Sequence, residues 1–109
     1  MPHTIEDAMR KMPDALRQYE GAGLEAVLHF KFTGAEAGEW NAIIRDGKCD
    51  VAQGIPRQKP TVSLTADSDL FLGVLGGEVD ATQAFMAGRI RLAGDMDLAR
   101  RLLLAFAAR

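Results

Sequence analysis

The side chains that could perform covalent or acid–base chemistry are few in this sequence and lie far apart. The chain has two histidines, His3 and His29, and one cysteine, Cys49. Neither histidine has a second metal ligand or an orienting carboxylate at a recognisable spacing, so we interpret both as structural or solvated. Cys49 lies in a predicted strand with no helix N-terminus after it, and we interpret it as a small buried hydrophobe. These residues therefore predict no nucleophile and no metal site.

The remaining polar motifs have simpler structural interpretations. The serines lack the Gly-x-Ser-x-Gly pattern of a nucleophile elbow. Asp67 and Asp69 are typical of a helix cap, because an acid–base pair would need burial to separate their pKa values. The glycines of Gly73–Gly77 are not followed by Lys-Ser or Lys-Thr, which a phosphate loop requires. The sequence thus predicts no catalytic residue and no cofactor, and an enzyme is the least favoured function.

Composition and charge restrict the class of protein and its partners. The chain has 109 residues, 48% of them hydrophobic and 26% charged, so we expect a single folded domain over residues 1–109. A formal net charge of −2 argues against nucleic acid as a partner. Acidic residues near the N-terminus replace the basic start of a signal peptide, and no apolar stretch reaches the roughly 20 residues that cross a bilayer. We expect a cytoplasmic location.

Hydrophobic periodicity defines the elements that position these side chains. Apolar residues from Ile5 to Tyr19 repeat at helical spacing after Thr4 as N-cap, and Pro13 predicts that this helix ends near Met12. Period-two alternation predicts five strands, of which the first three form a meander around the loop at 34–38 and the Asp46-Gly47 turn. The predicted strands are Leu24–Thr33, Trp40–Arg45, Lys48–Gln53, Thr61–Thr65 and Arg89–Gly94.

Three further helices follow from capping and apolar stripes. Asp67 to Asp69 precede a helix, Leu70–Leu75, that is apolar around most of its circumference and so must be covered on more than one side. Asp80-x-x-Gln83 resembles a capping box before a helix that Gly88 stops, and Asp95 caps the last helix. The sequence predicts an α+β fold in which these helices cover the apolar face of the sheet.

That apolar face has two interpretations, and periodicity does not separate them. It is either a filled core or a surface that holds a ligand or a partner. The residues predicted on it are Leu28, Phe30, Phe32, Trp40, Ala42, Ile44, Val62, Leu64, Ile90 and Leu92.

From Leu24 onward the chain resembles the sterol carrier protein 2 (sterol-binding) domain family of nonspecific lipid carriers. The resemblance runs in order through Gly23–Ala26, Phe30–Gly34, Trp40, Asp46-Gly47, Gly54, Thr61–Leu64, Asp69–Phe71 and Ala84–Asp95. The last stretch, which passes from a helix end through a strand and a glycine to a helix cap, is the most specific. The C-terminal Ala107-Ala108-Arg109 lacks the peroxisomal Ser-Lys-Leu type of tripeptide, which favours a bacterial stand-alone member.

The resemblance implies a five-stranded, mostly antiparallel sheet covered on one face by about four helices. It also implies an apolar tunnel between sheet and helices that accepts fatty acyl chains, sterol-like lipids or isoprenoids, without catalysis. The expected ligand-binding residues are Phe32, Trp40, Phe71, Leu72, Leu75, Phe85, Met86, Leu102, Leu103 and Phe106. Gln83 is either a contact for the polar end of a ligand or only part of the capping box.

Two functions from different classes stay open. The first is the non-enzymatic binding or carriage of a lipid. The second is an accessory or oligomerisation subunit that uses the same apolar groove for a partner protein or a quinone-biosynthesis intermediate. A homodimer and transient membrane contact through the amphipathic N-terminal helix are further expectations about partners.

Overall fold

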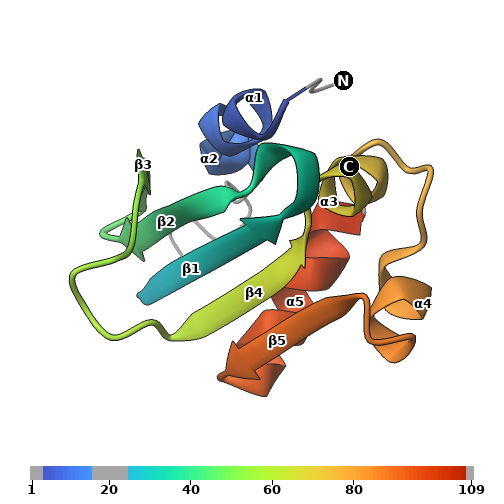
Figure 1. Cartoon of the computed structure of the whole chain (residues 1–109). Coiled ribbons are helices and arrows are strands. Elements are labelled where there is room, and N and C mark those ends of the chain that lie inside the picture. The colour runs from blue at the N-terminus through green and yellow to red at the C-terminus, as the bar shows by residue number, and fades with distance from the viewer. Residues whose placement is uncertain (1–3, 16–24, 108–109) are drawn as a thin grey trace.

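The protein folds as one mixed sheet with helices packed against it (Figure 1). The structure is a computed structural model that describes residues 4–15 and 25–107; for Ala15 and residues 104–107 it describes the backbone alone. The strands are β1 (Ala26–Thr33), β2 (Gly38–Arg45), β3 (Lys48–Gln53), β4 (Val62–Asp67) and β5 (Ile90–Gly94). Their spatial order is β3-β2-β1-β4-β5. The pairing of β1 with β4 is parallel and the other three pairings are antiparallel, which confirms the predicted sheet.

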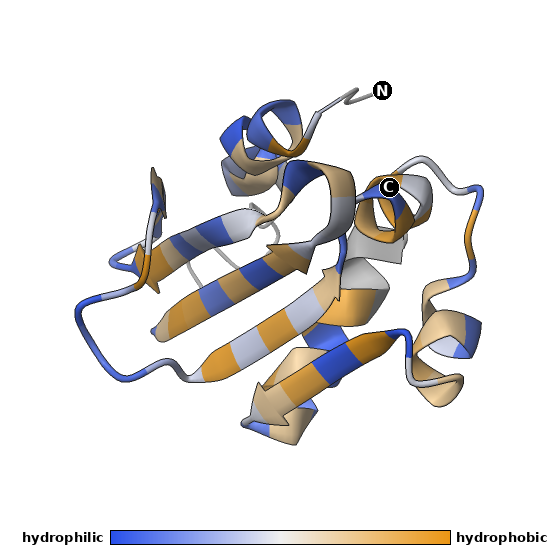
Figure 2. Ribbon diagram, viewed as in Figure 1, coloured by the Kyte–Doolittle hydropathy of each residue, from blue (hydrophilic) through white to orange (hydrophobic). Residues whose placement is uncertain are grey.

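Alternation along the strands separates an apolar face of the sheet from a polar one (Figure 2). Phe30 faces the same side as its partners Trp40 on β2 and Leu64 on β4, and this side joins the hydrophobic core. The register continues this face across the sheet, since Leu64 lies opposite Leu92 of β5. Because side chains alternate, the residues between them, such as Lys31 and Arg91, belong to the opposite face.

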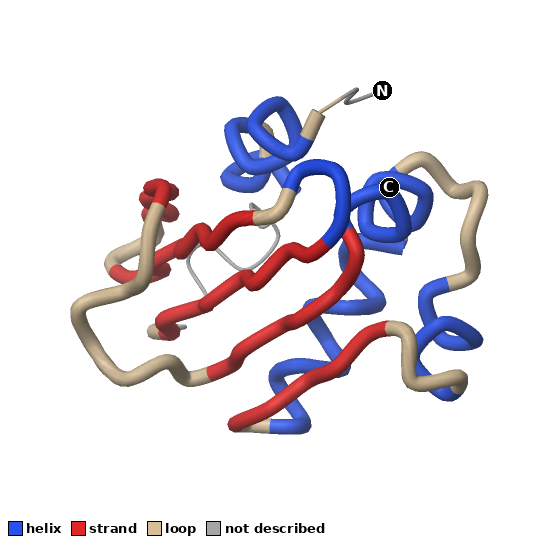
Figure 3. The backbone as a smooth tube through the Cα atoms, in the orientation of Figure 1, coloured by secondary structure: helices blue, strands red, loops and turns tan. Residues whose placement is uncertain are grey.

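Helices of unequal length cover the apolar face. They are α1 (Ile5–Arg10), α2 (Met12–Ala15), α3 (Ser68–Leu75), α4 (Ala81–Met86) and α5 (Met96–Ala107). Figure 3 shows α1 and α2 beside the β2–β3 half of the sheet and α5 behind the β4–β5 half; α2 contacts β3, and α5 contacts β4 and β5. None of the described helices is long and apolar enough to span a bilayer.

Capping confirms most of the predicted helix starts. The Thr4 hydroxyl accepts from the Asp7 N–H, the Asp67 carboxylate accepts from the first turn of α3, and Asp80 accepts from the Gln83 N–H. The Asp95 carboxylate accepts from Leu98 at 3.1 Å in the same way. A side-chain acceptor at this position satisfies an N–H that the helix itself cannot pair.

The N-terminal helix differs from the prediction. The first helix ends at Arg10, close to the predicted end near Met12, but a second short helix, α2, follows it and carries Pro13 in its first turn. Proline is tolerated there because the N–H that it lacks would have no acceptor within the helix. The predicted start of the first strand at Leu24 lies outside the described residues.

The loop predicted at residues 34–38 contains a short 3₁₀ helix, η2 (Gly34–Glu36), which ties two helices together. Ile5 at the start of α1 donates its N–H to Glu36 Oε1 at 2.9 Å. The Glu36 N–H donates in turn to Ser68 Oγ of α3 at 3.0 Å. Ser68 is completely buried, so this polar connection holds α1 and α3 at the same end of the sheet.

Candidate functional site

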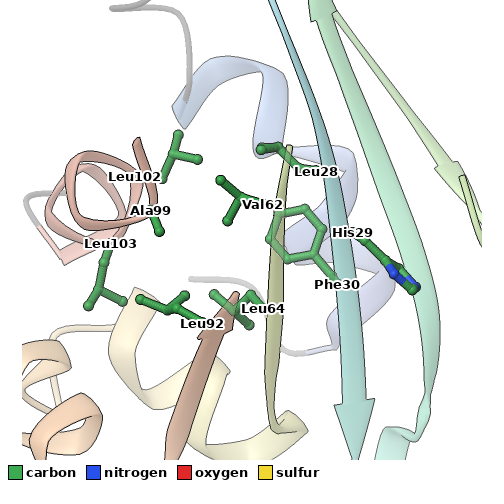
Figure 4. A pocket seen from close by; sticks show the side chains of 9 residues that line it. All are labelled: Leu28, His29, Phe30, Val62, Leu64, Leu92, Ala99, Leu102 and Leu103. Carbon is green, nitrogen blue, oxygen red and sulfur yellow. The ribbon is translucent and has the colours of Figure 1, made fainter. Parts of the chain in front are cut away.

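An apolar cavity lies between the sheet and α5 (Figure 4). Strands β1, β4 and β5 supply one wall, and one stripe of α5 supplies the other. The residues around it are Leu28, His29, Phe30, Val62, Leu64, Leu92, Ala99, Leu102 and Leu103. His29 contributes no polar group to the interior, because its ring points to the opposite side of β1 (Figure 4). The cavity therefore offers no hydrogen bond from the side chains that line it.

The cavity is nearly closed in this structure. Its free volume is about 10 Å³, which is close to the smallest space that holds one water molecule. Pockets that bind small molecules measure roughly 300 to 1,000 Å³. A lipid can therefore enter only if the lining side chains or α5 move apart.

Four of the residues expected from the resemblance lie at or beside this cavity, and a fifth is buried in the same core. Leu102 and Leu103 line it directly. Phe32 and Phe71 are buried next to it, with ring centroids 5.0 Å apart, and both pack near the lining Phe30 at 6.1 and 6.2 Å. Leu75 is also buried in the core. The structure thus gathers these side chains on one side of the sheet.

The other expected residues are placed differently. Met86 is 79% exposed, so its predicted inward orientation is wrong; α4 has only six residues and buries just Ala81 and Ala84. Gln83 is exposed, while Leu72 and Phe85 are only partly buried at the edge of the core. The side chain of Phe106 lies outside the described residues.

Trp40 lines a second hollow on the same face, beneath α1 and α2. This hollow is open to solvent and measures about 580 Å³, and its surroundings mix apolar and charged side chains. Its lining residues are Glu6, Arg10, Pro13, Trp40, Cys49, Asp50, Val51, Ala52 and Gln53. The structure therefore separates Trp40 from the cavity under α5 that Leu102 and Leu103 line.

Apart from His29, whose ring points away, the cavity residues that the expected site lacked are Leu28, Phe30, Val62, Leu64, Leu92 and Ala99. The strand alternation already placed the first five on the apolar face, and Ala99 is buried on α5 beside Leu102 and Leu103. The missing information was which half of the sheet the longest helix covers. The crossing of α5 over β4 and β5 decides this, and it depends on packing between distant segments.

The candidate chemical residues do not assemble into a reactive site. His29 is 6% exposed, and its Nε2 lies 3.2 Å from Glu39 Oε1 without a hydrogen bond of adequate geometry. Cys49 is half-buried rather than fully buried, because it sits on the edge strand β3 beside the open hollow. Within the described residues there is no group of three or more His, Cys, Asp or Glu side chains that could hold a metal ion.

The curated relatives of this chain are much longer proteins that it matches over a part of their length. Hydroxysteroid dehydrogenase-like protein 2 of Xenopus tropicalis is 35% identical over 78 residues, which is 72% of this chain and 19% of that protein. The same protein of Mus musculus is 27% identical over 93% of this chain and 21% of its own length. The chain thus spans about a fifth of the length of these curated relatives.

Solved structures share the fold. Palmitated SCP2L2 from Aedes aegypti superimposes with a TM-score of 0.73 at 22% identity, over 94% of both chains. The ubiquinone synthesis protein UbiJ-SCP2 gives a TM-score of 0.62 at 15% identity, over 93% of this chain and 90% of that one. The SCP-2 sterol transfer family matches residues 5–106. Because that match covers nearly the whole chain, this protein belongs to the SCP-2 sterol transfer family.

Proposed function

We propose that this protein binds and carries a lipid whose acyl chain occupies the apolar cavity between the sheet and α5. The observation that carries the proposal is the lining, in which nine residues from β1, β4, β5 and α5 present almost entirely apolar surface to the interior. Membership of the SCP-2 sterol transfer family supports lipid binding and transfer. The palmitated state of the Aedes aegypti protein makes a fatty acyl chain the favoured ligand class. In this proposal the protein performs no covalent chemistry.

The nearly closed cavity sets a requirement on the ligand. Opening space of about 300 Å³ costs on the order of 7 kcal/mol, at roughly 24 cal/mol per Å³. Each buried methylene returns about 0.8 kcal/mol. An acyl chain therefore needs about nine methylenes to offset the opening, so we expect long-chain fatty acids to bind and short-chain fatty acids not to bind.

Native mass spectrometry and thermal unfolding test this requirement with two probes that differ only in chain length. Hexadecanoic acid should give a one-to-one complex and raise Tm, since ligand at about 100 times its Kd adds about 2.7 kcal/mol to the unfolding free energy. Octanoic acid, with the same carboxylate, should leave the mass and Tm unchanged. Equal binding of both acids, or of neither, would contradict the proposal.

The accessory-subunit function is a second candidate, favoured by the fold shared with UbiJ-SCP2. It predicts that the purified protein carries an isoprenoid quinone precursor or forms a defined complex through the same apolar face. Organic extraction followed by mass spectrometry separates the two candidates. An extracted fatty acid supports the carrier, whereas a prenylated aromatic ring supports the accessory subunit.

A further inference from the structure

One end of the sheet carries two arginines and a hollow on the face that the helices do not cover. The hollow measures about 420 Å³. Arg91 of β5 lies opposite Thr65 of β4, and Ile90 before it is buried in the core. Since side chains alternate along a strand, Arg91 lies on the uncovered face. Arg89, in the bend just before β5, lines the same hollow. The lining residues are Thr33, Thr65, Ala66, Asp67, Leu70, Gly88, Arg89 and Arg91.

The local charge of this hollow is positive although the whole chain carries −2. Asp67 is the only acidic residue in the lining, and its Oδ2 accepts from the N–H groups of Asp69 and Leu70 at 3.0 and 3.2 Å. Its charge is thus already engaged by the N-terminus of α3. Within the described part of the chain, neither Arg89 nor Arg91 forms a salt bridge with a carboxylate.

A large exposed apolar side chain lies three residues before Arg89 in the chain. Met86 ends α4 and is 79% exposed. The turn that joins it to β5 is held by two backbone hydrogen bonds, from Gly88 to Phe85 at 3.0 Å and from Arg89 to Ala84 at 2.9 Å. This turn therefore fixes the backbone between Met86 and Arg89, which are three residues apart at the junction of α4 and β5. Figure 1 shows the corner between α4 and β5, at the opposite end of the sheet from the β3–β4 loop.

The apolar face of the N-terminal helix is not available for the membrane contact expected from its amphipathic sequence. Ile5, Ala8 and Met9 of α1 are 2%, 1% and 0% exposed, so they already belong to the core. The Ile5 N–H is also bound to Glu36. Insertion of this face into a bilayer would require α1 to leave the fold.

We propose that the α4–β5 corner, defined as Met86, Arg89 and Arg91, docks this protein onto an anionic phospholipid bilayer. Lipid phosphates pair with the two arginines at the hollow, and Met86 enters the apolar boundary of the bilayer. Leu92, the residue after Arg91, lines the lipid cavity from the other face of β5. Docking here therefore brings the β5 wall of that cavity next to the membrane. The inference rests on the proposed carrier function, since a carrier must meet the membrane that supplies or receives its lipid.

Sedimentation with vesicles tests the proposed pairing of the two arginines with lipid phosphates. The full chain should bind vesicles of phosphatidylcholine mixed with phosphatidylglycerol, bind phosphatidylcholine alone far more weakly, and dissociate at high salt. The double variant R89Q/R91Q should bind the anionic vesicles about 30-fold more weakly, since each surface-proximal arginine contributes about fivefold. The matched control R45Q/R57Q changes net charge equally at exposed positions elsewhere and should lose less than about threefold.

A second pair of variants tests the apolar contact. Met86→Ser should weaken vesicle binding, whereas Ile55→Ser should not, although Ile55 is also 66% exposed. Hexadecanoic acid binding in solution, measured separately, should be unchanged in all four variants, which separates this inference from the carrier function. Equal losses in R89Q/R91Q and R45Q/R57Q, or equal binding to both kinds of vesicle, would overturn the docking proposal whatever the result with hexadecanoic acid.

Discussion

The two halves of the helix-covered face enclose spaces that differ in volume and in polarity. Under α5 the space is almost closed, at about 10 Å³, and apolar. Under α1 and α2 the space is open, at about 580 Å³, and its walls include Glu6, Arg10 and Asp50. A lipid binds where water is expelled from apolar surface, and not where existing space is largest. The smaller cavity is therefore the better candidate for the acyl chain.

Element length explains the difference. Helix α5 has twelve residues, and its buried Leu98, Ala99, Leu102 and Leu103 lie on the side that contacts β4 and β5. The four residues of α2 cover the edge strand β3 only in part, so Trp40 and Val51 stay partly exposed. A long helix over inner strands gives a tight interior, and a short helix over an edge strand leaves a groove.

Truncation of one apolar side chain in each half should give the largest contrast. Leu64, 4% exposed, lines the closed cavity, and Leu64→Ala should lower the unfolding free energy by about 2 to 5 kcal/mol because a buried cavity is created. Val51→Ala beside the open hollow should cost less than about 1 kcal/mol, because water already reaches that site. Urea denaturation measures both. Similar losses in the two variants would show that the halves are packed equally.

Replacing one alanine in each half by a larger residue should change the affinity for hexadecanoic acid in one half and not in the other. Ala99 is 1% exposed at the cavity, so Ala99→Phe should occupy the acyl site. It should weaken hexadecanoic acid binding by about 5- to 150-fold, given the roughly 1 to 3 kcal/mol that overpacking costs. Ala52→Phe in the open hollow should leave affinity within about twofold of the wild type, since that hollow has spare volume. Isothermal titration provides the affinities.

The enlarged variants need a folding control, because Ala99→Phe could lose binding by unfolding. Circular dichroism at the titration temperature supplies it, and Ala99→Val provides a smaller step with the same direction of change. If the affinity falls from the wild type to Ala99→Val and again to Ala99→Phe while the secondary structure is unchanged, the ligand lies against α5. A loss seen only with Ala52→Phe would move the ligand to the open hollow.

The smallest effect is expected at the charged rim of the open hollow. Glu6 Oε2 and Arg10 Nη2 lie 3.6 Å apart, with side chains 60% and 73% exposed. Because water and salt screen such a pair, Glu6→Gln should cost no more than about 0.5 kcal/mol. Thermal unfolding in low and high salt should show this small difference disappearing as salt rises. A loss above 1 kcal/mol, of about fivefold or more in the unfolding constant, would mean that the rim is structural.

Residue pattern predicted the fold well because caps and alternation are local. Asp67, Asp80 and Asp95 each accept from the N–H two or three residues later, and strand alternation placed Leu64 and Leu92 on the apolar face before their pairing was known. Pattern failed for the orientation of Met86, because the short helix α4 buries only Ala81 and Ala84. It placed Trp40 correctly on the apolar face but did not separate it from the cavity under α5. Which half of the sheet is sealed depends on contacts between segments far apart in sequence.

Photo-cross-linking with a hexadecanoic acid that carries a diazirine along its chain tests the central claim most directly. The acyl carbon marks whichever side chains surround it, and peptide mass spectrometry identifies them. We predict cross-links to α5 at Ala99, Leu102 or Leu103 and to β5 at Leu92, which unlabelled hexadecanoic acid suppresses. Cross-links confined to Trp40 and the β3 residues 49–53 would contradict the account and assign the lipid to the open hollow.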